Sequence, residues 1–254
     1  MSAIYIEIAA TRGSAPRDAG TVMRVTATDC AGTIGGGALE YRAIATARRM
    51  LVANRTSHME TYPLGPGLGQ CCGGSVTLSY GHDGRTVDVA HRCELKSVRP
   101  PARPVALWIW GAGHVGRAVI DCCPANAFDI TWIDSAADRF PDAVPPYVTQ
   151  IPVADMPRLA RRAPQGAHHL IFTYSHDIDL ALCAALLKSG ARQIGLIGSA
   201  TKRARFERRL RAAGLDPTPI TCPIGDKKLG KAPHEIAHGT INALLALAHG
   251  EVSA

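Results

Sequence analysis

The chain has 254 residues, 46% of them hydrophobic, which is enough for one large or two ordinary globular domains. Its 28 basic and 21 acidic side chains leave a net charge of +7, and much of the excess lies in residues 202–211. A solvated helix face explains that run better than a nucleic-acid surface, because only Phe206 interleaves with the basic residues. No apolar run approaches the ~20 residues that span a bilayer. We therefore expect neither a membrane protein nor a nucleic-acid-binding protein.

The cysteines and the first residues predict a compartment. Eight cysteines without a signal peptide favour reduced thiols over a disulfide scaffold. Residues 1–8 lack a basic n-region and alternate like a strand. We therefore expect a cytoplasmic protein.

Periodic patterns in the first part of the chain predict a smaller α+β domain over residues 1–95. Strand patterns flank a single helical one. The predicted strands cover residues 4–10, 21–26, 58–62 and 75–80, and the predicted helix covers 38–52. A proline-rich stretch at 96–104 is typical of a stiff linker to the next domain.

The second part of the chain, residues 105–254, predicts a Rossmann-like α/β domain. Short apolar runs that suit strands buried on both faces alternate with helical patterns. The predicted strands are 105–110, 130–133, 170–174 and 193–197, and the predicted helices are 114–123, 178–188 and 201–213. Such alternation requires right-handed crossovers, and hence a doubly wound parallel sheet.

Two adjacent cysteines, Cys71 and Cys72, follow a glycine-rich run and precede Gly73 and Gly74. Neighbouring side chains diverge on a strand and lie about 100° apart on a helix, so both thiols do not easily face one core. Glycine lets backbone approach a ligand closely, and a thiolate both binds soft metals and carries persulfide sulfur. The pair is therefore a candidate site for sulfur or a soft metal. The alternative is one buried thiol and one without a role, since free cysteine often packs as a small hydrophobe.

A dinucleotide fingerprint is formed by Gly111, Gly113 and Gly116, between a predicted strand and a predicted helix. Asp134 ends the next predicted strand, about where a ribose-binding carboxylate belongs. Helix amides and the helix dipole favour a phosphate at such a turn. His114, at the helix start, is placed either to contact a phosphate or to cap the helix. The alternative is that the glycines only permit tight packing.

The string HExxH occurs at His234, Glu235 and His238. In zinc proteases it places two imidazoles on one helical face with a glutamate base. A catalytic zinc needs a third protein ligand, and the residues that follow do not supply the metzincin pattern. Coincidence is therefore the preferred interpretation, and an incidental metal site or a zinc hydrolase is kept as the alternative.

The chain as a whole resembles the xanthine dehydrogenase accessory protein family, XdhC/CoxI. Its short motifs occur in the family's order over nearly the full length. They are 13–17 (GSAPR), 32–40 (GTIGGGALE), 64–74 (LGPGLGQCCGG), 111–116 (GAGHVG), 175–177 (SHD), 194–199 (IGLIGS) with Lys202, and 223–225 (PIG) leading to 233–237. The second and third motifs are specific, whereas many unrelated proteins share the Rossmann string.

The resemblance implies a non-enzymatic accessory factor for a molybdenum hydroxylase. Such a protein binds the molybdenum cofactor (molybdopterin), acts as its chaperone, supports its sulfuration, and helps to insert it into the molybdenum-binding subunit of xanthine dehydrogenase. A cysteine desulfurase is the expected sulfur donor. Cys71 and Cys72 would then hold molybdenum or receive sulfur, and a carrier with exposed loops is a candidate homodimer.

Two further groups are candidates for binding the pterin phosphate. Gly35, Gly36 and Gly37 precede a helix that carries Glu40 in its first turns, which makes a second candidate anion cradle. Arg17, together with Arg12, suits bidentate phosphate binding. A hairpin turn with solvated arginines is the alternative.

A free-standing NAD(P)-dependent oxidoreductase is the alternative function. It would bind NAD(P), or another nucleotide, at the glycine fingerprint. His176 with Asp177 is the best acid–base pair that the sequence offers for such an enzyme.

Overall fold

The computed structural model describes the chain in segments. They are residues 2–13, 15–64, 74–84, 86–87, 101, 103–226 and 228–249. Contacts between residues divide the chain into two compact units, Met1–His91 and Arg92–Ala254. Most of the predicted linker lies outside the described residues. Each unit is described by itself.

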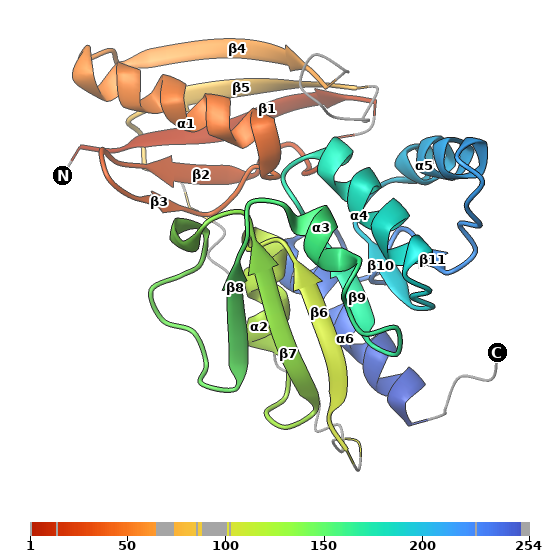
Figure 1. Cartoon of the computed structure of the whole chain (residues 1–254). Coiled ribbons are helices and arrows are strands. Elements are labelled where there is room, and N and C mark those ends of the chain that lie inside the picture. Colours follow the sequence, from red (N-terminus) through yellow and green to blue (C-terminus); the bar gives the residue numbers. More distant parts are fainter. Residues whose placement is uncertain are drawn as a thin grey trace. The chain divides into compact units, whose positions relative to one another are not determined.

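Unit 1 is an antiparallel sheet with one helix across it (Figure 1). Within the described residues its elements are β1 (Ile4–Arg12), β2 (Val22–Val25), β3 (Cys30–Ala31), α1 (Gly37–Val52), β4 (Ser57–Pro63) and β5 (Ser75–Gly81). The strand order is β3-β2-β1-β5-β4. The central strand β1 pairs with β2 and β5, so that Ile6 lies opposite both Met23 and Tyr80.

The core of unit 1 lies between α1 and one face of this sheet. Strand β1 buries Ile4, Ile6 and Ile8, which alternate along it as the pleat requires. The helix buries Leu39, Ala43, Ala47 and Met50, whose spacing places them on one helical face. One buried stripe therefore faces one buried sheet surface.

Unit 2 contains a six-stranded, entirely parallel sheet among its described residues. The strands are β6 (Val105–Trp110), β7 (Phe128–Asp134), β8 (Val148–Pro152), β9 (His168–Ile171), β10 (Ile194–Leu196) and β11 (Ile220–Thr221). Their order is β11-β10-β9-β6-β7-β8. The chain moves outward from β6 to β8 and then returns to place β9 beside β6. The switch point between β6 and β9 is where doubly wound proteins bind ligands, outside the carboxyl ends of the strands.

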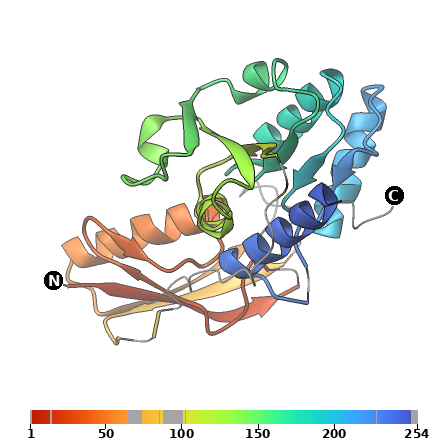
Figure 2. The same cartoon turned by 90° about the horizontal axis from the view of Figure 1, so that it is seen from below.

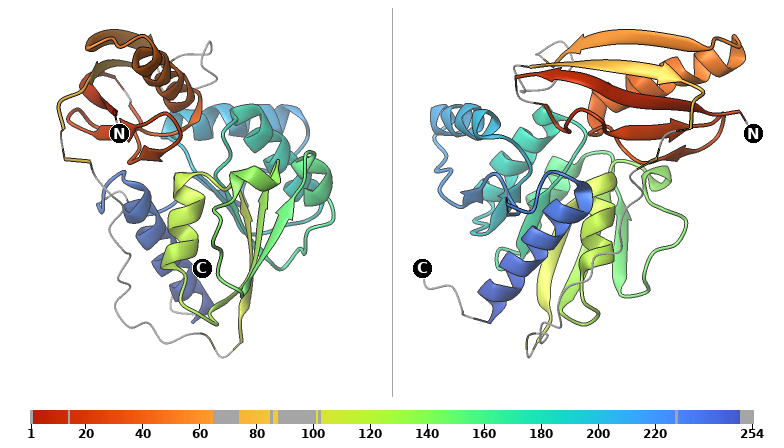
Figure 3. Two further views of the ribbon diagram at one scale, coloured as in Figure 1. Left: turned by 90° about the vertical axis from the view of Figure 1, so that its left-hand side faces the viewer. Right: turned by 180° about the vertical axis from the view of Figure 1, so that it is seen from behind.

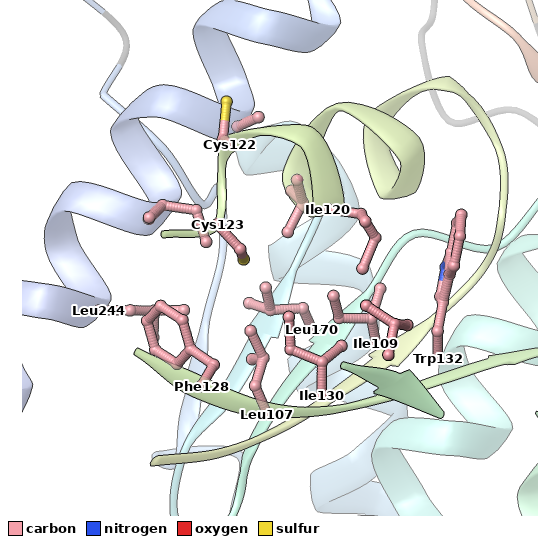
Figure 4. Packing of buried hydrophobic residues seen from close by; sticks show 14 of the residues in the cluster. Leu107, Ile109, Ile120, Cys122, Cys123, Phe128, Ile130, Trp132, Leu170 and Leu244 are labelled. Carbon is pink, nitrogen blue, oxygen red and sulfur yellow. The ribbon is translucent and has the colours of Figure 1, made fainter. Parts of the chain in front are cut away.

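Helices cover both faces of this sheet (Figures 2 and 3). They are α2 (His114–Cys122), α3 (Met156–Ala160), α4 (His176–Lys188), α5 (Ala200–Ala212) and α6 (Pro233–Ala248), with a short 3-10 helix, η2 (Ala137–Arg139), after β7. Helices α2 and α6 cover one face, where Leu107, Ile130, Leu170 and Leu244 share a cluster (Figure 4). Helices α3, α4 and α5 cover the other face. The predicted Rossmann sheet with a smaller α+β domain is confirmed.

The strand predicted at residues 170–174 is displaced in the structure. It begins at His168 and ends at Ile171, and its four residues are all buried. The prediction followed apolar residues and so excluded the two histidines. Strands β3, β8 and β11 and helix α3 were not predicted, because they are short or carry exposed residues. No described helix is long and apolar enough to cross a membrane.

Candidate functional site

The glycine turn, residues 111–116, leaves the carboxyl end of β6 and leads into α2. Gly111 has a φ of +119°, and a side chain there would meet the carbonyl oxygen of Phe172 at 2.5 Å. A side chain at Gly116 would clash with the carbonyl oxygen of Gly111. Gly113 differs, because its φ is −75° and a side chain there would meet no described atom within 4 Å. Packing requires the first and third glycines, whereas the second leaves open space at the start of α2.

Asp134 braces the turn from the end of β7. Its Oδ2 accepts a hydrogen bond from the backbone amide of Ala112 at 2.6 Å. Its Oδ1 accepts from the amide of Ser135 at 2.6 Å and from its hydroxyl at 3.0 Å. The side chain is buried. The predicted ribose-binding carboxylate therefore already accepts hydrogen bonds from three donors of the chain, and it holds the Gly111–Ala112 peptide in place.

The amino end of α2 is open toward the carboxyl edge of the sheet. Gly113 is its N-cap residue and makes no side-chain cap, and the first turn carries no acidic residue. The first amides of a helix have no partner within it and carry a partial positive charge. His114, the first residue of α2, is exposed. The predicted phosphate-binding residues Gly113 and His114 thus lie together at this helix end.

Arg117 joins the turn to the segment after β7. Its Nε donates to the carbonyl oxygen of Ala112 at 3.0 Å, and its Nη2 donates to that of Arg139 at 2.8 Å. Arg139 places its Cζ atom 4.7 Å from the centroid of the Tyr174 ring, which follows β9. Arg117, Arg139 and Tyr174 lie far apart in the sequence, and no motif predicts them, because only the strand order brings them together.

A buried ion pair lies at the carboxyl ends of β9 and β10. Lys202 Nζ is 2.6 Å from Asp179 Oδ2 and donates to the carbonyl oxygen of Ile197 at 2.8 Å. Asp179 Oδ1 accepts from the hydroxyl of Thr173 at 2.6 Å and from its amide at 3.2 Å. Burial raises the pKa of Asp179, and Lys202 and Thr173 oppose that shift. The pair connects the first turns of α4 and α5 to the loops that precede them.

His176, the first residue of α4, is close to the basic helix α5. Its Nδ1 is 3.2 Å from Nη2 of Arg205. Burial, followed by the charges of Lys202 and Arg205, lowers the pKa of His176 to about 4. Asp177 turns away, because its side chain is 92% exposed and lies 3.8 Å from Arg209. His176 is therefore a neutral imidazole near pH 7, and the two residues of the predicted acid–base pair have different surroundings.

The two motifs of unit 1 contact each other. A side chain at Gly35, whose φ is +122°, would meet Pro16 Cγ at 2.6 Å and Arg17 Cγ at 3.7 Å. Arg17 is only 9% exposed, whereas Arg12 at the end of β1 is exposed. Arg17 thus lies beside the predicted glycine cradle. It is buried, so the alternative prediction of a solvated arginine in a hairpin turn is wrong for Arg17.

The glycine cradle of residues 35–37 holds an anion that belongs to the chain. Glu40 is buried, and its Oε2 accepts from the hydroxyl of Thr33 at 2.5 Å. The same oxygen accepts from the amides of Ile34 at 2.9 Å and Gly36 at 3.1 Å. An external anion would have to use donors other than these.

The cysteine pair lies in the connection from β4 to β5. Cys71, Cys72 and Gly73 are outside the described residues, so their predicted roles stay predictions. The ends of the connection are joined, because the amide of Leu64 donates to the carbonyl oxygen of Gly74 at 2.8 Å.

The other described cysteines contribute mainly to packing. Burial raises the pKa of Cys123 to about 12, and burial raises that of Cys183 as well. In Figure 4 the Cys123 sulfur points into the cluster under α2, and the Cys122 sulfur points away. Cys122 is disulfide-bonded, so the expectation of reduced thiols is wrong at this position.

The HExxH string lies on α6. The carboxylate of Glu235 accepts from the amide of Ala232 at 2.7 Å, which caps the helix. His238 Nδ1 lies 3.4 Å from the side-chain amide of Asn242. No group of three or more His, Cys, Asp or Glu side chains in the described part of the chain is arranged to hold a metal ion.

Comparison with known proteins decides the family. The family model for the XdhC Rossmann domain matches residues 107–242, more than half of the chain, and the model for the XdhC and CoxI family matches residues 2–63. The chain belongs to the XdhC and CoxI family. The resemblance drawn from the motifs is thus confirmed. The stretch between the two matches, residues 64–106, includes the cysteine pair.

Two relatives of this XdhC-type chain are informative. The uncharacterized protein YqeB of Escherichia coli (strain K12) is 24% identical over 246 residues. That match covers 94% of this chain but 42% of YqeB, so the chain spans less than half of that relative's length. The crystal structure of a xanthine dehydrogenase from Bacillus halodurans has a TM-score of 0.51 and 18% sequence identity, and the match covers 100% of this chain and 93% of that one. At this identity the likeness shows a shared fold.

Proposed function

We propose that this XdhC-type protein binds the molybdenum cofactor, supports its sulfuration, and delivers it to a xanthine dehydrogenase. A cysteine desulfurase would supply the sulfur. Membership of the XdhC and CoxI family supports this accessory role. The open space at Gly113 is the observation that carries the binding part of the proposal.

The glycine turn fits the phosphate of a pterin cofactor. A phosphate on Gly113 would take hydrogen bonds from the first amides of α2, where the helix dipole favours negative charge. Asp134 holds the Ala112 amide, and Arg117 holds the Ala112 carbonyl oxygen, so the backbone next to the phosphate is fixed before binding. A fixed set of donors loses little conformational freedom when the ligand arrives.

The oxidoreductase alternative needs an acid–base residue that works near neutral pH. General acids and bases are most effective when their pKa lies near the operating pH. With its pKa lowered to about 4 and its Nδ1 next to Arg205, His176 does not fit that task. The geometry therefore favours a carrier over a dehydrogenase that uses this pair.

Replacing Gly113→Asp tests the binding part. Aspartate accepts the φ of −75°, meets no described atom within 4 Å, and is a preferred N-cap residue, so the fold is expected to persist. Its carboxylate would occupy and repel the phosphate position. We expect molybdenum cofactor binding by the full chain to weaken at least about ten-fold, a loss of about 1.4 kcal/mol.

Gly166→Asp is the matched control. Gly166 precedes β9 at the opposite, amino edge of the sheet, and a side chain there also meets no described atom within 4 Å. It should bind the cofactor like the unmodified protein. Equal binding by Gly113→Asp would exclude the turn as the site. Tight NADH binding with turnover of a carbonyl compound would favour the oxidoreductase.

Variants of the cysteine pair test the proposed role in sulfuration of the cofactor. We expect Cys71→Ala or Cys72→Ala to lower the sulfido content and the activity of the client xanthine dehydrogenase, whereas Cys30→Ala serves as the control. The client's activity, measured with the desulfurase present, must fall for at least one variant of the pair. If client activity is unchanged with both Cys71→Ala and Cys72→Ala, the cysteine pair does not handle sulfur.

A further inference from the structure

Arg139 and Tyr174 meet across the switch point of the parallel sheet. Strands β7 and β9 flank β6, Arg139 ends the 3-10 helix after β7, and Tyr174 follows β9. Because the Cζ atom of Arg139 lies 4.7 Å from the Tyr174 ring centroid, their contact passes over the carboxyl end of β6. The glycine turn starts at that same end. The two side chains therefore border the place where a ligand of the turn would extend.

The backbone of Arg139 is fixed relative to the turn, while its side chain is exposed. Arg117 donates both to the carbonyl oxygen of Arg139 and to that of Ala112 in the turn. The next residue, Phe140, packs edge-on against Trp132 with ring centroids 5.2 Å apart, and Trp132 Nε1 donates to the carbonyl oxygen of Gly111 at 3.0 Å. The guanidinium can thus change position without movement of its backbone.

Tyr174 is anchored in a similar way. The hydroxyl of Thr173 binds the buried carboxylate of Asp179 at 2.6 Å, and the amide of Ser175 donates to that hydroxyl at 3.3 Å. The Tyr174 ring itself is 49% exposed. Large aromatic rings bury more of their surface when a partner is available, so a half-exposed ring on a fixed backbone leaves a face for a ligand.

We propose that Arg139 and Tyr174 form a stacking slot for the planar heteroaromatic ring of a ligand whose phosphate binds the glycine turn. A phenol ring and a planar guanidinium are the two side-chain surfaces that stack well on such rings. An exposed contact between a guanidinium and an aromatic ring is weak, so a ligand ring replaces it at little cost. The positive charge of Arg139 also suits a ligand that carries phosphate.

This inference rests on the proposed function, because it extends the ligand of that site. It names the ligand class as a phosphate joined to a planar ring, which a pterin phosphate and a nucleotide both provide. The two sources differ in their ring. Neopterin monophosphate is the probe for a pterin phosphate, and GMP is the probe for a nucleotide. Inorganic phosphate serves as the probe without a ring.

The test titrates the full chain with neopterin monophosphate and follows pterin fluorescence. We expect Tyr174→Ala to weaken binding about ten-fold, as loss of one stacking ring does elsewhere, whereas Tyr174→Phe retains it. Arg139→Gln should weaken binding several-fold. Competition by inorganic phosphate should stay unchanged in Tyr174→Ala.

Two matched controls lie at the amino edge of the sheet. Tyr147, 39% exposed, precedes β8, and the exposed Arg192 precedes β10. Tyr147→Ala and Arg192→Gln should bind the probe like the unmodified protein. Thermal unfolding of every variant identifies one that has lost its fold, and Tyr174→Phe then tests the ring while the packing is kept.

The outcomes distinguish ring binding by Arg139 and Tyr174 from phosphate binding by the glycine turn. If Gly113→Asp abolishes probe binding but Tyr174→Ala and Arg139→Gln do not weaken it, the turn binds phosphate and the slot is wrong. If the unmodified protein binds neither neopterin monophosphate, GMP nor inorganic phosphate, the proposed function fails and the slot fails with it. Tighter binding of GMP than of the pterin, with the same dependence on Tyr174, would support the slot and identify a nucleotide ring.

Discussion

His169 is fully buried in the middle of the parallel sheet, although it is a polar residue. Its ring nitrogens have complementary partners, because Trp110 Nε1 donates to Nδ1 at 3.5 Å and Nε2 donates to the carbonyl oxygen of Pro164 at 3.3 Å. The bond from Trp110 requires an unprotonated Nδ1 and therefore the neutral ring, whereas Nε2 can donate to Pro164 in either protonation state. Burial is the main cause that lowers the pKa of His169 to about 4, from an ordinary value of 6.5. The imidazole therefore packs as a neutral residue of the core.

This environment predicts a loss of stability in acid. The unfolded chain binds a proton on His169 near pH 6.5, whereas the folded chain does so only near pH 4. The contribution of the neutral His169 to the free energy of unfolding should therefore be fully present above pH 6.5. It should decrease as the pH falls toward 4, by about 3 kcal/mol at most. Denaturant unfolding at pH 7 and pH 5 measures the difference.

His169→Gln is the comparison variant, because glutamine keeps one donor and one acceptor but does not titrate. Its unfolding free energy should depend less on pH across this range. Some dependence will remain, since burial also lowers the pKa of His168 and His176. If the unfolding free energies of the unmodified protein and of His169→Gln depend equally on pH, His169 is not a source of the acid sensitivity.

Individual residues of the site were predictable where the backbone demands a residue type. Gly111 and Gly116 were found from spacing alone, and their packing explains why. The partners of Asp134 and Glu40 were not predictable, because a sequence shows where a carboxylate lies along the chain but not which amides turn toward it. The sequence predicts ribose binding for Asp134 and places Glu40 on the helix after a predicted anion cradle. In the structure, both carboxylates accept hydrogen bonds from backbone amides of neighbouring glycine-rich segments.

Among the elements, the longer ones were predicted closely and the short ones were missed. Helices α1, α2, α4 and α5 and strand β6 lie within two residues of the prediction. The helices carry apolar residues at helical spacing, and β6 is a continuous apolar run. The strands β3 and β11 have two residues each, which is too few for any period. The edge strand β8 has three exposed residues of five. Pairing with a neighbour, which the sequence does not display, defines these strands.

Helices α4 and α5 are connected by the buried pair of Asp179 and Lys202. A double-mutant cycle should show strong coupling. Lys202→Met leaves the Asp179 carboxylate buried without its partner, so we expect a loss of about 3–5 kcal/mol of unfolding free energy. Lys202→Met combined with Asp179→Leu should be more stable than Lys202→Met alone, because no charge is then buried unpaired. Denaturant unfolding measures all four proteins, and additive losses would contradict the coupling.

The whole chain comprises two units, each with a hydrophobic core of its own. The core of unit 1 lies between α1 and the antiparallel sheet, and the two clusters of unit 2 lie on either face of the parallel sheet. The chain has three tryptophans, Trp108, Trp110 and Trp132, and all of them lie on β6 or β7. Tryptophan fluorescence therefore reports on unit 2, whereas circular dichroism reports on both units.

This distribution allows the units to be followed separately in the full chain. Leu78 of β5 is fully buried in unit 1, and its replacement by alanine should cost about 2–5 kcal/mol there. We expect Leu78→Ala to lower the unfolding midpoint seen by circular dichroism and to leave the tryptophan midpoint unchanged. Leu170→Ala on β9 is the matched variant of unit 2 and should lower the tryptophan midpoint. Equal shifts of the tryptophan midpoint by both variants would show that the two units unfold as one, because a single cooperative transition transmits every local loss to every probe.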